Sequence, residues 1–287
     1  MACQGPAGSY CRQAIGRRSV RSSQVTLTAQ LLSTIYCLLQ ESVIIYGLNP
    51  VLEALRAGRV DGLRVSGRHD TRVDEIVRLA TESGVPVSRV DKRLLDQAAG
   101  GAAHQGVVAD ARALPGYSVS DLVRSASGHA PLVVVLDGIE DPHNVGAILR
   151  TVDAAGADGV VRQARHAAPL GPAVAKASAG AIAHVRVATV VNIARALDEL
   201  RAAGVWTVGL AADAPLFYDA VDFHLPTAIV LGAEGAGLRR LVRERCEVLA
   251  RVPMSGRVDS LNVSVAAGVV LFEAVRQRRL AGEGHRR

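Results

Sequence analysis

The sequence predicts an α/β protein built on a parallel β-sheet that helices cover on both faces. Two observations support this. Apolar runs without polar alternation recur after residue 131, as in strands that are buried on both faces. Segments with apolar residues at helical spacing separate these runs, so strand and helix alternate along the chain. A shorter alternation of about 70 residues precedes them and predicts a second, smaller α/β domain.

The smaller domain is expected over residues 43–112. Asn49 followed by Pro50 has the pattern of a helix N-cap with proline at the first helical position, and Gly58 can end that helix. Apolar residues at helical spacing over 73–83 predict a second helix. Strands are expected at 60–66, 85–90 and 104–109, and a short helix at 91–98.

The larger domain is expected over residues 131–287, after a linker at 113–130 that is rich in Ser, Gly and Pro. We expect one helical turn inside the linker, at 121–125. The apolar runs predict strands at 132–136, 159–161, 185–188, 205–210, 228–231 and 248–252. Helices fit between and after them, at 145–155, 172–179, 193–203, 238–245 and 261–278.

Residues 1–42 differ in composition from the rest of the chain. They are rich in Ser, Arg and Gln and have no acidic residue before Glu41. Such a start is typical of a transit peptide. The interpretation we favour is an upstream start site appended to a protein that begins near Val43. The apolar run at 31–39 is too short to span a bilayer, so no membrane association is expected.

The net charge of +6 is confined to the two ends of the chain. Residues 1–42 carry +3 and residues 276–287 carry +4, which leaves −1 for the body. Bulk charge therefore does not predict nucleic-acid binding, and any RNA site must use local arginines. Three of the four cysteines precede residue 43, and no Cys/His spacing for zinc is present. A reducing compartment and no metal site are therefore expected.

A polar segment follows the first apolar run of the larger domain. The run ends at Leu136, an acidic loop follows, and Asn144 then opens a helix that contains Arg150. Since α/β sheets place ligands at the carboxyl ends of strands, Asn144 and Arg150 are candidate site residues. Taken alone, Asn144 could equally be an N-cap and Arg150 a solvated helix residue.

A glycine-rich segment with the sequence AIVLGAEGAGLRRL occupies residues 228–241. Gly232, Gly235 and Gly237 follow a strand and precede a helix, and glycines let backbone amides approach a ligand closely. The order G-x-x-G-x-G differs from the dinucleotide fingerprint G-x-G-x-x-G, and no ribose-binding acid follows about 20 residues later. The carboxylate of Glu234 would repel a pyrophosphate and suits a cationic or amine-bearing ligand.

A third segment, residues 251–278, leads from a strand through a polar loop into the last helix. Ser260 and Asn262 lie at the predicted start of this helix. Asp259 or Ser260 would cap the helix whatever the function. Capping by either leaves Asn262 inside the first turn, where asparagine is a mediocre helix former, so a functional role is expected for it.

In this order and spacing, the three segments resemble the SpoU/TrmH family of the SPOUT superfamily. The family pairs an Asn with an Arg six residues later, as Asn144 and Arg150 do. Its G-x-E-x-x-G loop is matched by residues 232–237, and its S-L-N-V-S motif by residues 260–264. The segments HQGVVA, YGLNPVLEAL and LFEAVRQR resemble the subfamily that methylates guanosine in 23S ribosomal RNA. The resemblance covers about residues 44–279.

The resemblance implies a C-terminal domain with a deep trefoil knot, which sequence patterns would not suggest because knots are nearly absent from proteins. It implies an L30e-like RNA-binding fold for the smaller domain and a cytoplasmic homodimer with the active site at the dimer interface. The cofactor would be S-adenosylmethionine, bound mostly through the main chain of Gly232, Val252 and Leu261.

The implied reaction transfers a methyl group to a ribose 2′-hydroxyl of 23S rRNA or its assembly precursor, at the guanosine of the P loop of the peptidyl-transferase centre. The family assigns Arg150 to the hydroxyl and its neighbouring phosphate. Because a guanidinium keeps its proton in proteins, we expect Arg150 as a phosphate clamp and leave the general base open. Asn144, Glu234, Ser260 and Asn262 would position Arg150, the RNA and the methionine moiety.

Two other functions stay open at this point. One is a methyltransferase of the same family that acts on tRNA or on another rRNA nucleotide. The other is a non-enzymatic RNA-binding factor for ribosome assembly, which the complete set of motif residues disfavours. A nicotinamide oxidoreductase is disfavoured by the order of the glycines.

Overall fold

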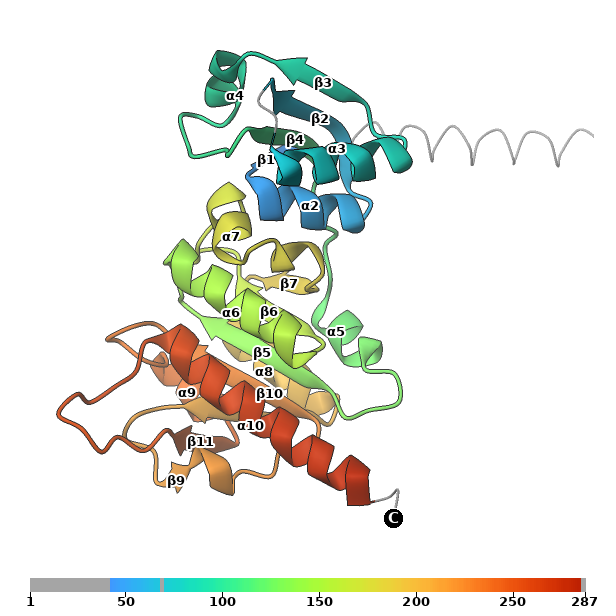
Figure 1. Ribbon diagram of the computed structural model, residues 1–287. Coiled ribbons are helices and arrows are strands. Elements are labelled where there is room, and N and C mark those ends of the chain that lie inside the picture. Colours follow the sequence, from blue (N-terminus) through green and yellow to red (C-terminus); the bar gives the residue numbers. More distant parts are fainter. Residues whose placement is uncertain (1–41, 68–69, 285–287) are drawn as a thin grey trace, which may run out of the picture. The chain divides into compact units, whose positions relative to one another are not determined.

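The computed structural model describes residues 42–67 and 70–284, which form two β-sheets (Figure 1). The expectations for residues 1–41 lie outside this description. The larger sheet has seven strands in the order β7-β6-β5-β10-β8-β11-β9, and every neighbouring pair is parallel. Its strands are β5 (Leu132–Asp137), β6 (Gly159–Gln163), β7 (Val187–Val190), β8 (Trp206–Leu210), β9 (Leu216–Phe217), β10 (Thr227–Gly232) and β11 (Val248–Arg251).

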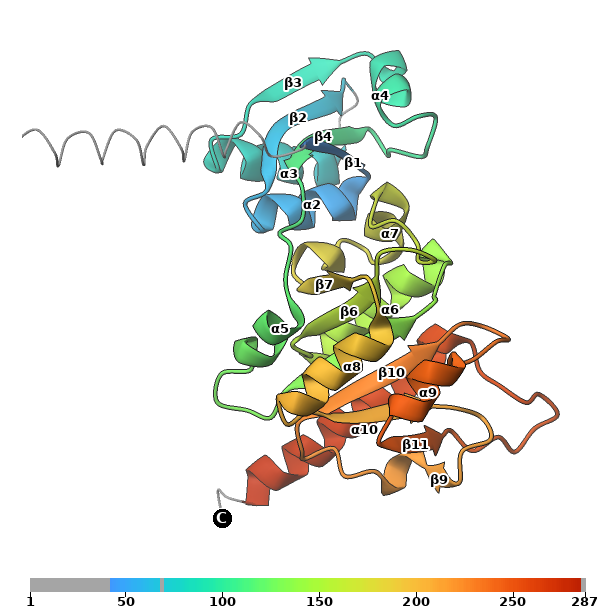
Figure 2. The same ribbon diagram turned by 180° about the vertical axis from the view of Figure 1, so that it is seen from behind.

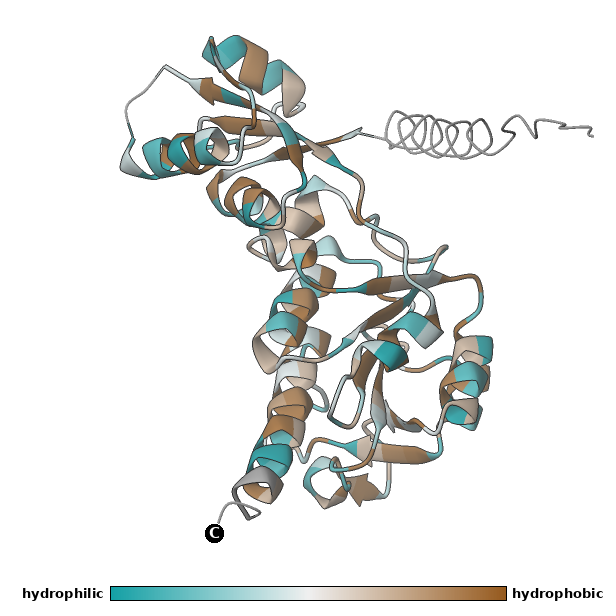
Figure 3. Cartoon of the chain, turned by 90° about the vertical axis from the view of Figure 1, so that its right-hand side faces the viewer, coloured by the Kyte–Doolittle hydropathy of each residue, from teal (hydrophilic) through white to brown (hydrophobic). Residues whose placement is uncertain are grey.

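The predicted parallel sheet is thus confirmed, with β9 as a two-residue addition that the apolar pattern does not indicate. Side chains alternate between two cores along each central strand, because successive residues of a strand point to opposite faces. In β5, Leu132, Val134 and Leu136 join one core, while Val133 and Val135 join the other. Most of the sheet is coloured hydrophobic in Figure 3 for this reason.

Helices cover both faces of the seven-stranded sheet (Figures 1 and 2). One face packs against α6 (Pro142–Ala155), α7 (Pro172–Ala177) and α10 (Val263–Gly284). The other packs against α5 (Val119–Ser125), α8 (Ile193–Ala202) and α9 (Arg240–Arg245). Two 3-10 helices lie at Ala181–Ala183 and Tyr218–Ala220. Because the strands inside this sandwich are all parallel, their carboxyl ends lie at one edge of the sheet.

Helix α5 lies in the segment expected to be a linker with one helical turn. Ser118 and Asp121 form a capping box, in which the Ser118 hydroxyl accepts from the Asp121 amide and the Asp121 carboxylate accepts from the Ser118 amide. Hydrogen bonds from Ser118 lower the pKa of Asp121 to about 2. Val119 and Leu122 are buried in the α8 core, so the helix is packed rather than free.

The smaller sheet has four strands in the order β1-β4-β2-β3, and only β2 and β3 are parallel. Its strands are β1 (Ser42–Tyr46), β2 (Val60–Ser66), β3 (Val87–Val90) and β4 (Val107–Arg112). Helices α2 (Leu48–Arg56) and α3 (Thr71–Glu82) cover one face, and α4 (Lys92–Ala98) covers the other. Strand β1 was not predicted, because it continues directly from the N-terminal segment, whose composition differs from that of the rest of the chain.

The start of α2 corrects the prediction that Asn49 is its N-cap. The helix begins at Leu48, and its N-cap residue is Gly47, with φ of 95°. The Leu48 amide donates instead to Oε1 of Gln105, at 3.2 Å. Asn49 accepts from Arg72 on α3. The HQGVVA segment therefore has a structural role, because Gln105 caps the first helix of the smaller sheet.

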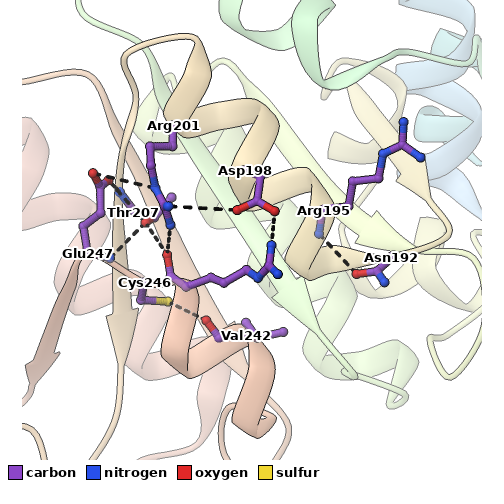
Figure 4. A network of polar contacts seen from close by, with 9 residues as sticks. Asn192, Arg195, Asp198, Arg201, Thr207, Val242, Cys246 and Glu247 are labelled. Carbon is purple, nitrogen blue, oxygen red and sulfur yellow. Dashed lines mark hydrogen bonds and ion pairs between the residues drawn. The ribbon is translucent and has the colours of Figure 1, made fainter.

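A polar network ties α8 to β8 and to the α9–β11 turn (Figure 4). Arg201 donates to the carbonyl of Arg245 at 2.7 Å, and the amides of Thr207 and Glu247 donate to each other's side chains at 3.1 Å. Burial raises the pKa of the neighbouring Cys246 thiol to about 12, so this cysteine stays protonated. The network lies at the amino ends of β8 and β11, opposite the edge described next.

Candidate functional site

A pocket of about 420 Å³ opens at the carboxyl ends of β8, β10 and β11. This volume is within the range of small-molecule sites, about 300–1,000 Å³. Its lining combines the loops after these strands with the first turn of α10. Six of the eight predicted site residues belong to the lining: Gly232, Glu234, Val252, Ser260, Leu261 and Asn262. The glycine-rich segment and the segment 251–278, which follow different strands, thus meet in this pocket.

The glycine loop closes on itself above the end of β10. Ala233 and Gly237 exchange two backbone hydrogen bonds, of 3.1 and 2.8 Å. A Cβ on Gly232 would lie 2.2 Å from the carbonyl carbon of Gly237, so no other residue fits there without moving the backbone. Gly235 and Gly237 have φ of 74° and 65°, which favour glycine. The three glycines are therefore needed for the loop itself, in addition to any close approach of a ligand.

Asn262 connects the three motifs. Its amide nitrogen donates to Oδ1 of Asn144 at 2.9 Å and to Oε1 of Glu234 at 2.6 Å. Its amide oxygen accepts from the backbone and the hydroxyl of Ser264, at 2.9 and 2.6 Å. Asn262 thus uses both amide hydrogens and both lone pairs of its oxygen.

The bonds to Ser264 make Asn262 the N-cap of α10, which begins at Val263. The expectation that Asp259 or Ser260 caps this helix, with Asn262 inside the first turn, is wrong. The helix begins two residues later than predicted, because a capping side chain sits just outside it. Asn262 combines capping with the links to Asn144 and Glu234.

Asn144 and Arg150 lie on different sides of α6. Asn144 is buried and faces the pocket residues through Asn262, although it is not itself part of the lining. Arg150 is exposed, outside the lining, and makes no side-chain hydrogen bond or ion pair within residues 42–67 and 70–284. Six helical residues span about 9 Å along the axis and turn by about 240°. The single chain therefore does not bring Arg150 to the other predicted residues.

An arginine that the motifs do not single out anchors the end of the glycine loop. The Arg239 backbone amide and Nε donate to the two carboxylate oxygens of Asp137, at 2.9 and 2.7 Å, and its Nη2 donates to Oε1 of Gln163 at 2.5 Å. Asp137 is fully buried at the end of β5, and Gln163 ends β6. The only sequence signal for this contact is an acid at the end of an otherwise apolar strand run.

Arg251 is a further member of the pocket that the sequence did not indicate. Its guanidinium lies 4.8 Å from the centre of the Phe217 ring, a cation–π contact between paired residues of β11 and β9. Glu234 and Asp259 supply two carboxylates to the lining, and Arg251 is the one cation among the described lining residues. Apolar side chains, including Leu210, form the remaining walls. The pocket can therefore hold a ligand with an apolar ring, a cationic part and an anionic part.

Across residues 42–67 and 70–284, no three His, Cys, Asp or Glu side chains come together as metal ligands. In the same part of the chain, every helix is too short or too polar to cross a membrane.

Comparison with known families gives two matches along the chain. Residues 131–272 match the SpoU rRNA Methylase family, and residues 44–116 match the RNA 2′-O ribose methyltransferase substrate binding family. Together these matches include both sheets and all three motifs.

Named relatives and solved structures agree with these families. The 23S rRNA (guanosine-2′-O-)-methyltransferase RlmB of Pseudomonas syringae pv. tomato is 46% identical over 239 residues, 82% of this chain and 95% of the relative. RlmB of Ralstonia nicotianae is 43% identical over 84% of this chain and 98% of the relative. The SpoU methyltransferase AviRb of Streptomyces viridochromogenes, solved with AdoMet, has a TM-score of 0.70 at 28% identity, covering 83% of this chain and 91% of that one.

Proposed function

The chain belongs to the SpoU rRNA methylase family, and we propose on this basis that it methylates the ribose 2′-hydroxyl of a guanosine in 23S rRNA. The methyl donor is S-adenosylmethionine, with which related structures are solved. The structural observation with the most weight is that Asn144, Glu234 and Asn262, one from each motif, form a single hydrogen-bonded group beside the pocket. A non-enzymatic assembly factor would have no need of that arrangement.

The pocket fits S-adenosylmethionine in the chemistry of its lining. Leu210, Val252 and Leu261 offer apolar surface to an adenosine. The carboxylates of Glu234 and Asp259 suit the amine and the sulfonium, and the Arg251 guanidinium suits the carboxylate. We assign the main chain of Gly232, Val252 and Leu261 to the adenosine, and Ser260 to the positioning of the methionine part. When bound, the cofactor supplies an electrophilic methyl group.

The residues of this chain contribute mainly by holding the two reactants in line, an effect worth up to about 7–11 kcal/mol. Asn262 fixes the rotamers of Asn144 and Glu234 through its two donated hydrogen bonds. Arg150, exposed and unpaired within the described chain, would bind the phosphate next to the target ribose and orient the 2′-hydroxyl. A guanidinium keeps its proton, so Arg150 is not the group that removes the hydroxyl proton.

We propose that the protein acts as a homodimer through α10. One side of this helix is core: Val263, Ala267, Val270, Leu271 and Ala274 are buried. Val265 and Phe272, seven residues apart, are each 51% exposed on another side. Large apolar side chains at that spacing form a stripe that a second copy would cover. Such a dimer would place the site, including Arg150, at its interface. Light scattering at micromolar concentration tests this: a monomer mass contradicts it.

Three finer assignments stay proposals. The target guanosine is the one in the P loop of the peptidyl-transferase centre, on free 23S rRNA or an assembly precursor. The protein works in the cytoplasm, where this rRNA is made. Convergence of the loops after β8, β10 and β11 with the start of α10 supports a trefoil knot there. Pulling single molecules by the ends of that region would leave a shortened contour if the chain is knotted.

The residue ranges 43–112, 113–130 and 131–287 are proposed as substrate domain, linker and methyltransferase domain. The L30e-like domain would bind RNA apart from the site of chemistry. Mapping 2′-O-methylation across rRNA and tRNA in a deletion strain and its complement tests the whole proposal. We expect one 23S guanosine to lose its methyl group on deletion. Loss at a tRNA position instead would reassign the substrate, and an unchanged map would exclude the activity.

A further inference from the structure

Arg162 occupies a position in β6 where the sheet pattern calls for an apolar residue. Alternation along the strand puts Arg162 on the same face as Val160, which belongs to the core beneath α6 and α10. In the sheet it lies between Leu136 of β5 and Thr189 of β7. The residue is only 7% exposed.

This buried guanidinium has no partner within the described chain. No side chain or carbonyl of residues 42–67 and 70–284 accepts a hydrogen bond from it, and no carboxylate pairs with it. Burial accordingly lowers the pKa of Arg162. An unpaired buried charge is unfavourable, and a fold that needed only packing here would use an aliphatic residue.

The tip of the side chain nevertheless reaches water. The side-chain nitrogen atoms that are sealed and unpaired within the described residues are the Nε atoms of Arg59, Arg64 and Arg112, and none belongs to Arg162. The side chain is therefore largely buried, while its guanidinium nitrogen atoms keep some contact with solvent. Within the described residues this side chain has no anionic partner, so it can bind an anion from outside the protein.

Arg162 lies near the edge of the sheet that carries the pocket. Arg162 is next to last in β6, beneath the loops that follow β5 and β6, which are joined by a 3.3 Å hydrogen bond from the Ala168 amide to the Ile139 carbonyl. Arg165 and His166, directly after the strand, are exposed. Two acids near this place already have partners: the exposed Glu140 lies 3.6 Å from His166, and the buried Asp137 at the end of β5 pairs with Arg239. Asn144 lies in the first turn of the neighbouring helix α6, which begins at Pro142 after the N-cap Asp141 and not, as expected, at Asn144.

We propose that Arg162 is an anion site that binds a backbone phosphate of the substrate RNA beside the methyl-transfer pocket. Phosphodiesters are the anions that an RNA-modifying surface meets, and guanidinium groups bind them with two parallel hydrogen bonds. The partner class rests on the proposed function. Arg162 is a binding residue and takes no part in methyl transfer itself.

The test compares R162M, R162K and the control R186M in the full chain. Methionine keeps the unbranched apolar stem and removes the charge. Arg186 is an exposed arginine at the amino ends of β6 and β7, the opposite edge of the same sheet, so R186M makes the same charge change away from the site. The measurements are affinity for a 23S rRNA fragment over a range of salt concentrations, the melting temperature without RNA, and calorimetric affinity for S-adenosylmethionine.

We expect R162M to weaken RNA binding about tenfold or more. The slope of log affinity against log salt concentration should become shallower by about one, as for one lost phosphate contact. R162K should lie between R162M and the wild type. The melting temperature of R162M should equal or exceed that of the wild type, because an unpaired charge has left the interior, and cofactor affinity should not change. R186M should match the wild type in RNA affinity.

Three results would overturn the proposal. The first is wild-type RNA affinity and salt slope in R162M. The second is unfolding of R162M, since that would mean that the guanidinium has a structural partner. The third is a rise in the melting temperature of the wild type with inorganic phosphate, while R162M binds RNA like the wild type. That result would mean an adventitious ion only. Failure of the proposed function is distinguishable, because it would remove methylation and leave the difference in RNA affinity between R162M and R186M.

Discussion

Asn262 donates a 2.6 Å hydrogen bond to the carboxylate of Glu234, and the same side chain caps α10. These two functions can be separated by mutation. Asn262→Ser keeps an N-cap, whereas Asn262→Ala loses it at a cost of about 1 kcal/mol. Both variants lose the paired amide donors that hold Glu234 and Asn144. We expect both to bind S-adenosylmethionine at least tenfold more weakly, with a lower melting temperature for Asn262→Ala only.

Calorimetry and thermal melting measure these effects side by side. If cofactor affinity followed the melting temperature, so that Asn262→Ser bound normally, Asn262 would be a helix cap and nothing more.

The glycine loop offers a steric prediction. Gly232→Ala would place a Cβ 2.2 Å from the Gly237 carbonyl carbon, so the loop must move away from the end of β10. We expect the variant to fold, with a destabilisation of about 1–3 kcal/mol, and to lose most of its cofactor affinity because the pocket wall is displaced. Gly116→Ala, where a Cβ meets nothing within 4 Å, is the control. Normal cofactor binding by Gly232→Ala would show that the loop is not part of the cofactor site.

The parallel sheet could be predicted because its strands are buried on both faces, which leaves a plain signal of uninterrupted apolar runs. Short or irregular elements gave no such signal. Strand β9 has two residues, and α2 is capped by Gln105 from more than fifty residues away, so local pattern favoured Asn49 instead. Local propensity does not report on partners that only the tertiary fold supplies.

The candidate site, like the fold, could be predicted from the sequence only in part. Spacing and residue type marked Asn144, Glu234 and Asn262, but the bonds among them depend on loops from three separate strand ends. Arg239 and Arg251 were missed because arginines near helix starts and strand ends are common, and only Asp137 and Phe217 distinguish these two. The position of Arg150, away from the pocket, follows from helical geometry once α6 is placed.

The capping box of α5 predicts how stability depends on pH. The folded-state pKa of Asp121 is about 2, below its ordinary value of 3.8. A lowered pKa contributes stability above the unfolded value, and that contribution is lost as pH falls from about 4 to 2. Asp121→Asn should therefore be less stable than the wild type at pH 6, with a smaller difference at pH 2.5. Urea unfolding at both pH values measures it. A difference independent of pH would mean that the carboxylate charge plays no part.

The first strand defines where the chain can be shortened. Ser42–Tyr46 form β1, whose five residues pair with Val108–Arg112 at the edge of the smaller sheet, and Ile45 is buried. A chain that starts at Ser42 should fold and methylate like the full chain. One that starts at Gly47 should lose at least the stability of one buried isoleucine, about 2–5 kcal/mol. Thermal melting and methyl-transfer assays distinguish the two. Loss of RNA binding in the chain that starts at Ser42 would make the basic extension a functional arm.

Arg150 is the residue on which the catalytic proposal depends most. Since it lies outside the pocket and is exposed, Arg150→Ala should abolish methyl transfer while S-adenosylmethionine binds with nearly normal affinity. Arg150→Lys keeps the charge but not the planar pair of donors, so a large defect is expected there too. Glu234→Ala, inside the pocket, should impair both cofactor binding and turnover.

The control is Arg195→Ala, another exposed helical arginine, which lies on the opposite face of the sheet in α8. Truncation of a solvated arginine usually changes stability by no more than about 0.5 kcal/mol, so both alanine variants should fold alike. Single-turnover methylation of a 23S rRNA fragment then separates them. If Arg150→Ala and Arg195→Ala were equally active as folded proteins, Arg150 would be an ordinary surface residue and the proposed phosphate clamp would have to be sought elsewhere on α6 or the loop before it.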